Sequence, residues 1–240
     1  MENALYVGLS RQVALQRQMA LVSNNIANVN TPGYRADKML FEEYVTKQDV
    51  TKEDLSMVLD YGQFKDTAAG QMSSTGNALD VALNGPGFMM VETAEGTKYS
   101  RAGNLTLNNE RVLVTASGNP VLDNGEGQIT MPENVREITI TTDGQIITDQ
   151  GAAGQIGMVE FANVNNMRST GDGYYMADNG EVAIPVQQTK MQQNMLEGSN
   201  VQAVLEMTDL IEISRQFQSM QRMLQNEHDR QRDTIQKLTE

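Results

Sequence analysis

Both ends of the chain carry apolar residues at alternating intervals of three and four, the spacing of a heptad repeat. They are Leu15, Met19, Val22, Ile26 and Val29 near the start, and Leu210, Ile213, Phe217, Met220 and Leu224 near the end. This period predicts two helices with narrow apolar stripes, over residues 3–30 and 194–240. At 1.5 Å per residue they would be about 42 Å and about 60 Å long. Because a narrow stripe must be buried, we expect the two helices to pair as an antiparallel coiled coil.

The residues between the two helices show a different pattern. From residue 78 to 193 short runs rich in Val, Ile, Thr and Tyr alternate with Gly- and Asn-containing turn signals. Asp143-Gly144 separates ITITT from QIITD, which is the strongest hairpin signal in the chain. Strands at this spacing are typical of an all-β barrel or sandwich.

The predicted fold class is therefore α+β, with the chain divided into four segments. These are an N-terminal helix (1–33), an extended connector (34–76), a central all-β domain (77–193) and a C-terminal helix (194–240). The connector holds only short apolar patches among charges and turn formers. Hydrophobic residues make up 39% of the chain and aromatic residues 5%, which favours a modest core with elongated parts.

The first predicted helix ends in an asparagine-rich stretch, SNNIANVNTPGYR (23–35). Asparagine is a poor helix former, so its placement needs a reason. In the heptad frame Asn25 and Asn30 flank the seam and can bridge to the paired helix, whereas Asn24 and Asn28 point away toward neighbouring subunits. Thr31-Pro32-Gly33 then ends the helix, and Pro32-Gly33 fits the centre of a type II turn. We interpret this triplet as the exit of the chain from the helical layer.

Composition excludes several classes of partner. The net charge is −13 and the pI about 4.5, which argues against nucleic acid and anionic lipid as ligands. No apolar run is long enough for a membrane-spanning helix, so direct membrane insertion is not expected. The start MENALYVGLSRQ lacks the features of a cleavable signal, which predicts a cytoplasmic protein or export without one.

Residues for catalysis or metal binding do not form a recognisable pattern. His228 is the only histidine and cysteine is absent, so the usual zinc sites are not expected. Glu42-Glu43 and Glu53-Asp54 are adjacent carboxylates of the kind that 31 acidic residues produce by chance. Residues 170–181 lack the spacing of a calcium loop and favour a turn-rich hairpin. We therefore expect no enzyme, cofactor or metal.

The outward faces of the two predicted helices are rich in amides: Gln12, Gln16, Gln18, Gln216, Gln218, Gln221 and Gln225. Such side chains suit polar contacts between helices in a bundle of many subunits. An alternative hypothesis is a secreted β protein that binds or hydrolyses carbohydrate. The low aromatic content counts against that alternative, because sugar sites commonly stack on aromatic rings.

Three segments resemble signatures of the bacterial flagellar rod and hook proteins. SNNIANVNTPGYR resembles their Asn-rich N-terminal motif. GPGFMMVE (85–92) and YSRAGNLTL (99–107) resemble the pattern of their β domain, and LEGSNVQAVLEMTDLI (196–211) resembles their C-terminal motif. The segments occur in family order over the whole chain. Length and the opening residues are most similar to proximal rod proteins, and distal rod proteins are the next alternative.

The resemblance implies a non-enzymatic structural subunit. Members of this family leave the cell through the flagellar export apparatus without a cleaved signal. They assemble helically, with copies of themselves and other rod proteins, into a hollow driveshaft in the periplasmic space of the basal body. Their terminal helices line the tube, which implies that the two seams, Asn25, Asn28 and Asn30 form the assembly interface.

Overall fold

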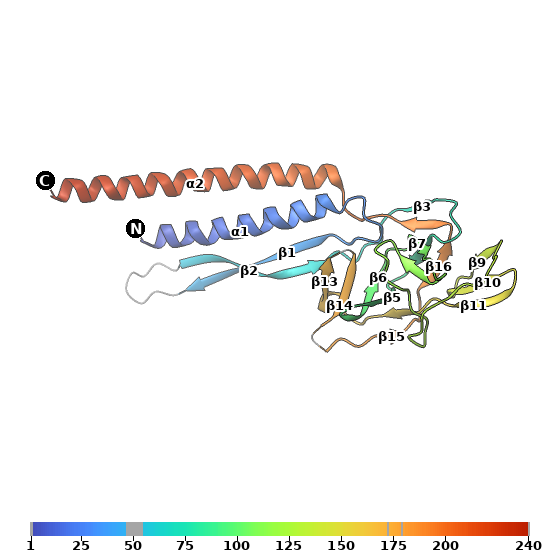
Figure 1. Cartoon of the computed structure of the whole chain (residues 1–240). Coiled ribbons are helices and arrows are strands. Elements are labelled where there is room, and N and C mark those ends of the chain that lie inside the picture. The colour runs from blue at the N-terminus through green and yellow to red at the C-terminus, as the bar shows by residue number, and fades with distance from the viewer. Residues whose placement is uncertain (1, 47–54, 172, 179, 240) are drawn as a thin grey trace. The chain divides into compact units, whose positions relative to one another are not determined.

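The computed structural model describes residues 2–46, 55–171, 173–178 and 180–239 (Figure 1). The chain divides into two compact units. A helical unit comprises residues Met1–Ala27, Asp37–Phe64 and Gln202–Glu240, and a β unit comprises Asn28–Ala36 and Lys65–Val201. The fold is thus α+β, with a helix near each end of the chain and a mostly β region between them.

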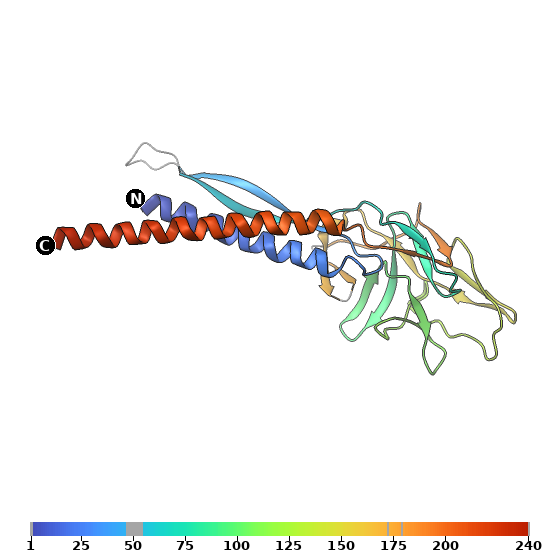
Figure 2. The same ribbon diagram turned by 90° about the horizontal axis from the view of Figure 1, so that it is seen from above.

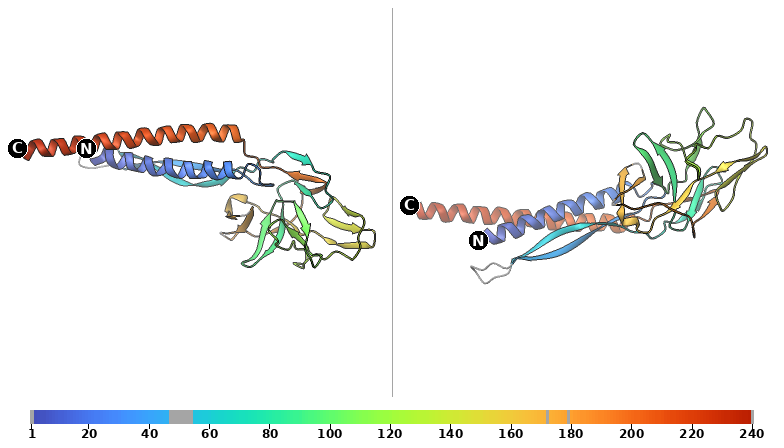
Figure 3. Two further views of the ribbon diagram at one scale, coloured as in Figure 1. Left: turned by 45° about the horizontal axis from the view of Figure 1, so that its top comes forward. Right: turned by 90° about the horizontal axis from the view of Figure 1, so that it is seen from below.

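The helical unit contains α1 (Glu2–Ala27), α2 (Ala203–Thr239) and a two-stranded sheet of β1 (Asp37–Thr46) and β2 (Leu55–Lys65). Figures 1 and 2 show α1 and α2 side by side and antiparallel, with the two chain termini toward the same end of the pair. The hairpin of β1 and β2 runs beside the helices (Figure 3), and β1 contacts α1. The segment predicted as an extended connector is therefore largely this hairpin.

Most of the β unit consists of short strands. They are β3 (Met72–Ser74), β4 (Val81–Asn84), β5 (Phe88–Thr93), β6 (Gly96–Ser100), β7 (Leu105–Leu107), β8 (Leu113–Thr115), β9 (Ile138–Ile140), β10 (Gln145–Thr148), β11 (Gly151–Gln155), β12 (Met158–Glu160), β13 (Met167–Gly171), β14 (Tyr174–Ala177), β15 (Ile184–Pro185), β16 (Lys190–Gln193) and β17 (Met195–Glu197), with a 3-10 helix at Val164–Asn166. The main sheet has the order β13-β14-β6-β5-β12-β15, and a second has the order β11-β10-β9. Shorter pairs are β16-β4, β17-β3 and β7-β8.

The turn signals in the sequence predicted this pairing well. β9 and β10 pair antiparallel, and Gly144 between them has a φ of +80°, as the Asp143-Gly144 hairpin requires. β13 and β14 also form a hairpin, which agrees with the turn-rich interpretation of residues 170–181.

Two large apolar clusters and a small one, described below, stabilise the β unit. The larger one is Val81, Leu83, Met89, Leu105, Leu113, Val121, Ile129, Met131, Ile140, Ile146, Ile156, Met158 and Met191. The second is built around Phe88, whose ring meets those of Phe161 and Tyr175 edge to face at centroid distances of 5.8 and 5.5 Å. Such geometry is favoured by the ring quadrupoles and adds to the burial of apolar area.

Two predicted helix boundaries are wrong. α1 ends at Ala27 rather than at residue 30, and residues 28–36 belong to the β unit. α2 begins at Ala203 rather than at 194, because Met195–Glu197 form β17, which pairs with β3.

Candidate assembly interface

The helical unit buries its predicted seam. Leu15, Val22 and Ile213 are buried in one cluster, with Met19, Ile26, Leu210 and Phe217 partly buried against it. Seven of the ten predicted seam residues therefore meet. The contact between α1 and α2 extends to Gly8. A Cβ atom placed there would lie 2.8 Å from Leu224 Cδ2 and 3.6 Å from Met220 Sδ. A residue without a side chain is what allows this close approach.

Asn25 joins three elements of the helical unit. Its side chain is only 1% exposed. The amide nitrogen donates to the carbonyl of Asp37 on β1 at 3.0 Å and to Glu206 Oε2 on α2 at 3.3 Å. The amide oxygen accepts from the N–H of Asp37 at 3.1 Å. The prediction that Asn25 bridges to the paired helix is confirmed, and the bond to β1 is an addition that the sequence did not indicate.

Val29, Asn28 and Asn30 do not take their predicted heptad places, since the helix has already ended. Val29 packs in the β unit against the cluster of Tyr34, Ala36 and Val201. The Asn28 side-chain oxygen accepts a hydrogen bond from Thr31 Oγ1 at 3.1 Å, and Asn30 is exposed. These asparagines belong to the turn after α1.

Thr31-Pro32-Gly33 forms a turn directly after α1. Tyr34 donates its N–H to the carbonyl of Thr31 at 3.3 Å, and Gly33 has a φ of +68°. This is the hydrogen bond and the positive φ of a type II turn. Gly33 also donates its N–H to the carbonyl of Glu197 at 2.8 Å, which attaches the turn to β17.

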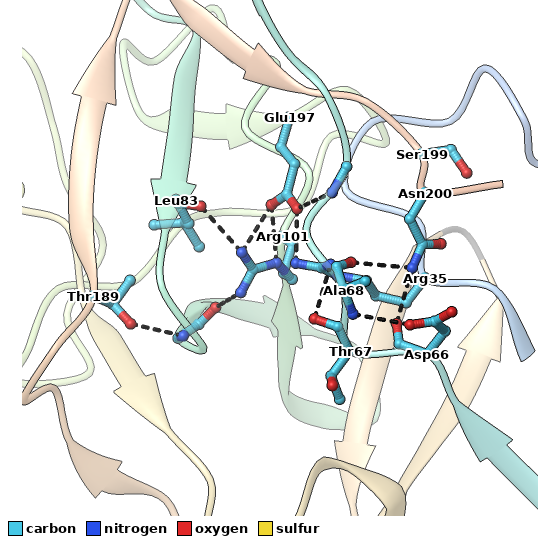
Figure 4. Close-up of polar contacts among 12 residues, drawn as sticks. Arg35, Asp66, Thr67, Ala68, Leu83, Arg101, Thr189, Glu197, Ser199 and Asn200 are labelled. Carbon is cyan, nitrogen blue, oxygen red and sulfur yellow. Dashed lines mark hydrogen bonds and ion pairs between the residues drawn. The ribbon is translucent and has the colours of Figure 1, made fainter. Parts of the chain in front are cut away.

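A buried polar cluster in the β unit brings the three signature segments together (Figure 4). The Glu197 carboxylate, whose side chain is fully buried, pairs through Oε1 with Arg35 Nη2 at 2.7 Å. Its Oε2 accepts from Arg101 Nε at 3.0 Å and Nη2 at 2.8 Å, and Oε1 accepts from the N–H of Gly70 at 3.0 Å. Charge-assisted bonds of this kind are stronger than neutral ones, and the paired contact from Arg101 fixes its orientation.

Two guanidinium groups share this single carboxylate, so backbone carbonyls compensate the remaining charge. Arg101 also donates to the carbonyls of Gly87 and Leu83, and Arg35 donates to that of Thr67. Burial lowers the pKa of Arg35, repulsion from Arg101 lowers it further, and Glu197 partly opposes both effects. Arginine remains charged after such a shift.

Asn200 connects neighbouring strands of the same cluster. Its side-chain oxygen accepts from the N–H of Ala36 at 2.7 Å, and its nitrogen donates to the carbonyls of Asp66 and Ala68 at 2.9 and 3.1 Å. Sequence reasoning placed none of Arg35, Arg101, Glu197 or Asn200 in a site. The available signal was that each of the three motifs contains at least one charged residue.

Large apolar side chains remain exposed on both helices. On α1 they are Tyr6, Leu9 and Val13, and on α2 they are Val204, Leu205, Met207, Ile211 and Met223. The sequence had suggested mainly amide-rich outward faces, so this apolar area is a correction. Exposed apolar side chains of this kind are typical of surfaces that contact another protein.

The potential metal ligands of the described residues lie apart from one another. No three of them lie together for a metal ion in that part of the chain. His228 is exposed on α2, and Glu53-Asp54 lie outside the described residues. No helix described is both long and apolar enough to cross a membrane.

Comparison with known proteins gives matches along the chain in the same order as the three motifs. Family models match for "Flagella basal body rod protein" at residues 5–35, "Flagellar hook protein FlgE/F/G D1 domain" at 82–148 and "Flagellar basal body rod FlgEFG protein C-terminal" at 192–237. These matches, with the paired terminal helices and the β unit, define a protein of the flagellar rod and hook class.

Relatives that match over nearly the whole chain identify the family within this class. The chain is 40% identical to the flagellar basal-body rod protein FlgF of Caulobacter vibrioides, over 99% of this chain and 98% of that protein. It is 33% identical to FlgF of Rhizobium meliloti, over 94% and 93% of the two chains. It is 31% identical to the rod protein FlgG of Bacillus subtilis, over 93% and 94%. The chain belongs to the flagellar basal-body rod protein family.

Proposed function

We propose that this chain is a non-enzymatic structural subunit of the flagellar rod, which assembles through its terminal helices and transmits torque for motility. One observation carries the proposal: α1 and α2 bury one narrow seam yet leave eight large apolar side chains exposed. A helix pair that exposes this much apolar area is incomplete alone, and lateral contacts with other subunits would cover it.

The seam supports a finer proposal for the helices. Its intervals of three and four residues are those of a left-handed coiled coil, with Leu15, Val22 and Ile213 as the most buried members. We assign α1 (Glu2–Ala27) and α2 (Ala203–Thr239) to assembly, residues 77–193 to a barrel- or sandwich-like outer domain, and 34–76 to the connection between them. The interface role of Asn28, Val29 and Asn30 remains part of this proposal.

Membership of the family supports a proposal for the location of this subunit. We propose export by the flagellar apparatus without a cleaved signal, followed by assembly with copies of the chain and with other rod proteins in the periplasmic part of the basal body. The proximal rod is favoured, because the length and the opening residues resemble proximal rod proteins and the chain is 40% identical to a FlgF protein. A distal position is the alternative.

The test is deletion of the gene in the bacterium that carries it, with electron microscopy of purified basal bodies. We expect cells that do not swim and rods that stop short, both restored by the full chain. Density for the restored chain close to the inner membrane would identify a proximal subunit, and density near the hook a distal one. Swimming cells with complete rods after deletion would refute the rod function.

A further inference from the structure

The β unit contains a pocket of about 620 Å³ that assembly through the helices does not involve. Its apolar lining comes from Met90 on β5, from Met158 and Val159 on β12, and from residues 183–186, which include β15. A volume of this size, with an apolar lining and a few polar groups, is typical of a ligand-binding site. The pocket is therefore a candidate binding site.

Two glycines leave space for the methionines that line the pocket. A Cβ atom at Gly157 would collide with Met90 Cε, and one at Gly144 would lie 3.4 Å from Met158 Cε. Methionine side chains are flexible and polarisable, so they adapt to apolar groups of different shape. Such a lining favours a peptide over a small molecule of fixed shape.

One wall of the pocket is an extended segment at the edge of the main sheet. β15 (Ile184–Pro185) is the last strand in that sheet and pairs with β12. Pro185 has no N–H to donate, so a partner strand cannot pair regularly along this edge. An occupant would instead be held by its side chains. The wall of residues 183–186 would accommodate about four extended residues, or about 13 Å.

The charges at the pocket are negative only. Glu126 and Asp143 line it and are exposed, and no Lys or Arg of the described residues lines it. Neither carboxylate has an ion-pair partner in the described part of the chain. Burial raises the pKa of the Tyr99 hydroxyl, and the Glu126 carboxylate raises it further, so Tyr99 remains a hydrogen-bond donor at the pocket.

We propose that this pocket binds an extended segment of another protein that carries apolar side chains together with Lys or Arg. The apolar side chains contact Met90 and Met158, and the cations pair with Glu126 and Asp143. Salt weakens such exposed ion pairs by screening. The net charge of −13 disfavours a second copy of this chain as the occupant. This site goes beyond the rod function and does not depend on it.

The probe is a short fluorescent peptide in which leucine and lysine alternate, titrated with the full chain and followed by anisotropy. We expect saturable binding that weakens with salt, and no binding of a matched peptide with glutamate in place of lysine. Glu126→Gln and Asp143→Asn should each lower the affinity about two- to five-fold, the range of an exposed ion pair. The matched control is Glu110→Gln, an exposed carboxylate of the β unit outside the pocket, which should leave the affinity unchanged.

Methionine methyl signals locate the bound peptide. In the full chain labelled with ¹³C at the methionine methyl groups, the signals of Met90 and Met158 should shift, whereas that of Met223, exposed on α2, should not. The proposal is overturned if the lysine peptide does not bind, if the glutamate peptide binds as well, or if Glu110→Gln lowers the affinity as much as the pocket variants. A shift at Met223 alone would place the peptide on the helices and also overturn it. Each of these results leaves the rod function standing, because deletion of the gene tests that function separately.

Discussion

The Glu197 carboxylate accepts two hydrogen bonds from the Arg101 guanidinium, from Nε at 3.0 Å and from Nη2 at 2.8 Å, with both side chains at most 2% exposed. The two residues are 96 positions apart, in the second and third signature segments. A third partner, Arg35, comes from the first segment. The motifs that mark the family are therefore also the parts of the β unit that hold each other in place.

Loss of the Glu197 charge should destabilise the β unit strongly. Glu197→Gln removes the carboxylate that two buried guanidinium groups share, and removal of one partner of a buried pair costs about 3–5 kcal/mol. Chemical denaturation followed by circular dichroism measures this loss. The matched control is Glu133→Gln, which removes an exposed ion pair with Arg111 and should cost less than about 1 kcal/mol. Equal losses in the two variants would contradict the stabilising role of the cluster.

Gly33→Ala should destabilise the exit turn for two reasons. The positive φ of +68° disfavours a side chain, and the added Cβ would lie 2.6 Å from the Arg101 backbone carbon. Gly76 is a matched control, since its φ is +73° but nothing lies within 4 Å of its Cβ position. We expect about 1–2 kcal/mol for Gly76→Ala, the cost of the left-handed conformation, and a larger loss for Gly33→Ala. A smaller loss at Gly33 than at Gly76 would exclude steric contact as the cause.

Asn25→Leu should loosen the hairpin and both helices of the helical unit. It leaves the N–H and carbonyl of Asp37 without this partner and removes the bond to Glu206, with a loss of about 1–3 kcal/mol. Hydrogen exchange should rise in residues 15–27 and 37–40. Ser23→Leu, at an exposed position on the same helix, should leave exchange unchanged. Normal protection in the Asn25 variant would refute the bridging role.

The helices of a dilute monomer should exchange their amide hydrogens faster than the core of the β unit. Only three residues are buried in the helix seam, whereas 13 are buried in the larger β cluster. Fewer buried apolar contacts lower the free energy of local opening. Hydrogen exchange with mass spectrometry measures this difference, and full slow-exchange protection at residues 5–29 and 205–225 would refute it.

Acid should weaken the loop held by Glu160. Burial raises the pKa of this carboxyl, but bonds from the N–H groups of Gln188 and Thr189 and from Thr189 Oγ1 outweigh it and lower the pKa below 4.5. A lowered pKa adds stability above pH 4.5 that is lost as pH falls through the folded-state value. The free energy of unfolding should therefore fall less between pH 7 and pH 3 in Glu160→Gln than in the parent chain, as denaturation curves at the two pH values would measure. An identical pH dependence in the two would contradict this assignment.

The sequence predicted the features that depend on short-range pattern. The helix stripes are visible because residues three and four apart share a face, and the Asp143-Gly144 hairpin is visible because its turn residues adjoin its strands. The helix was predicted to extend past Ala27 because Val29 continues the heptad spacing. An apolar residue at such a position can equally pack within a turn.

Long-range polar contacts could not be predicted in this way. Arg35, Arg101 and Glu197 are far apart in the chain, and no spacing relates them. Glu197 in particular lies in a segment that was expected to begin a helix, where a charged residue normally faces solvent. Its burial follows from the pairing of β17 with β3, which is a property of the whole β unit.

The position of Glu197 in the chain has a consequence for the order of folding. A chain that emerges from its N-terminus presents Arg35 and Arg101 long before the carboxylate that neutralises them, because Glu197 is residue 197 of 240. Burial of either arginine is costly until then, since an unpaired buried charge is strongly unfavourable. The β unit therefore completes its fold only after about four-fifths of the chain has emerged.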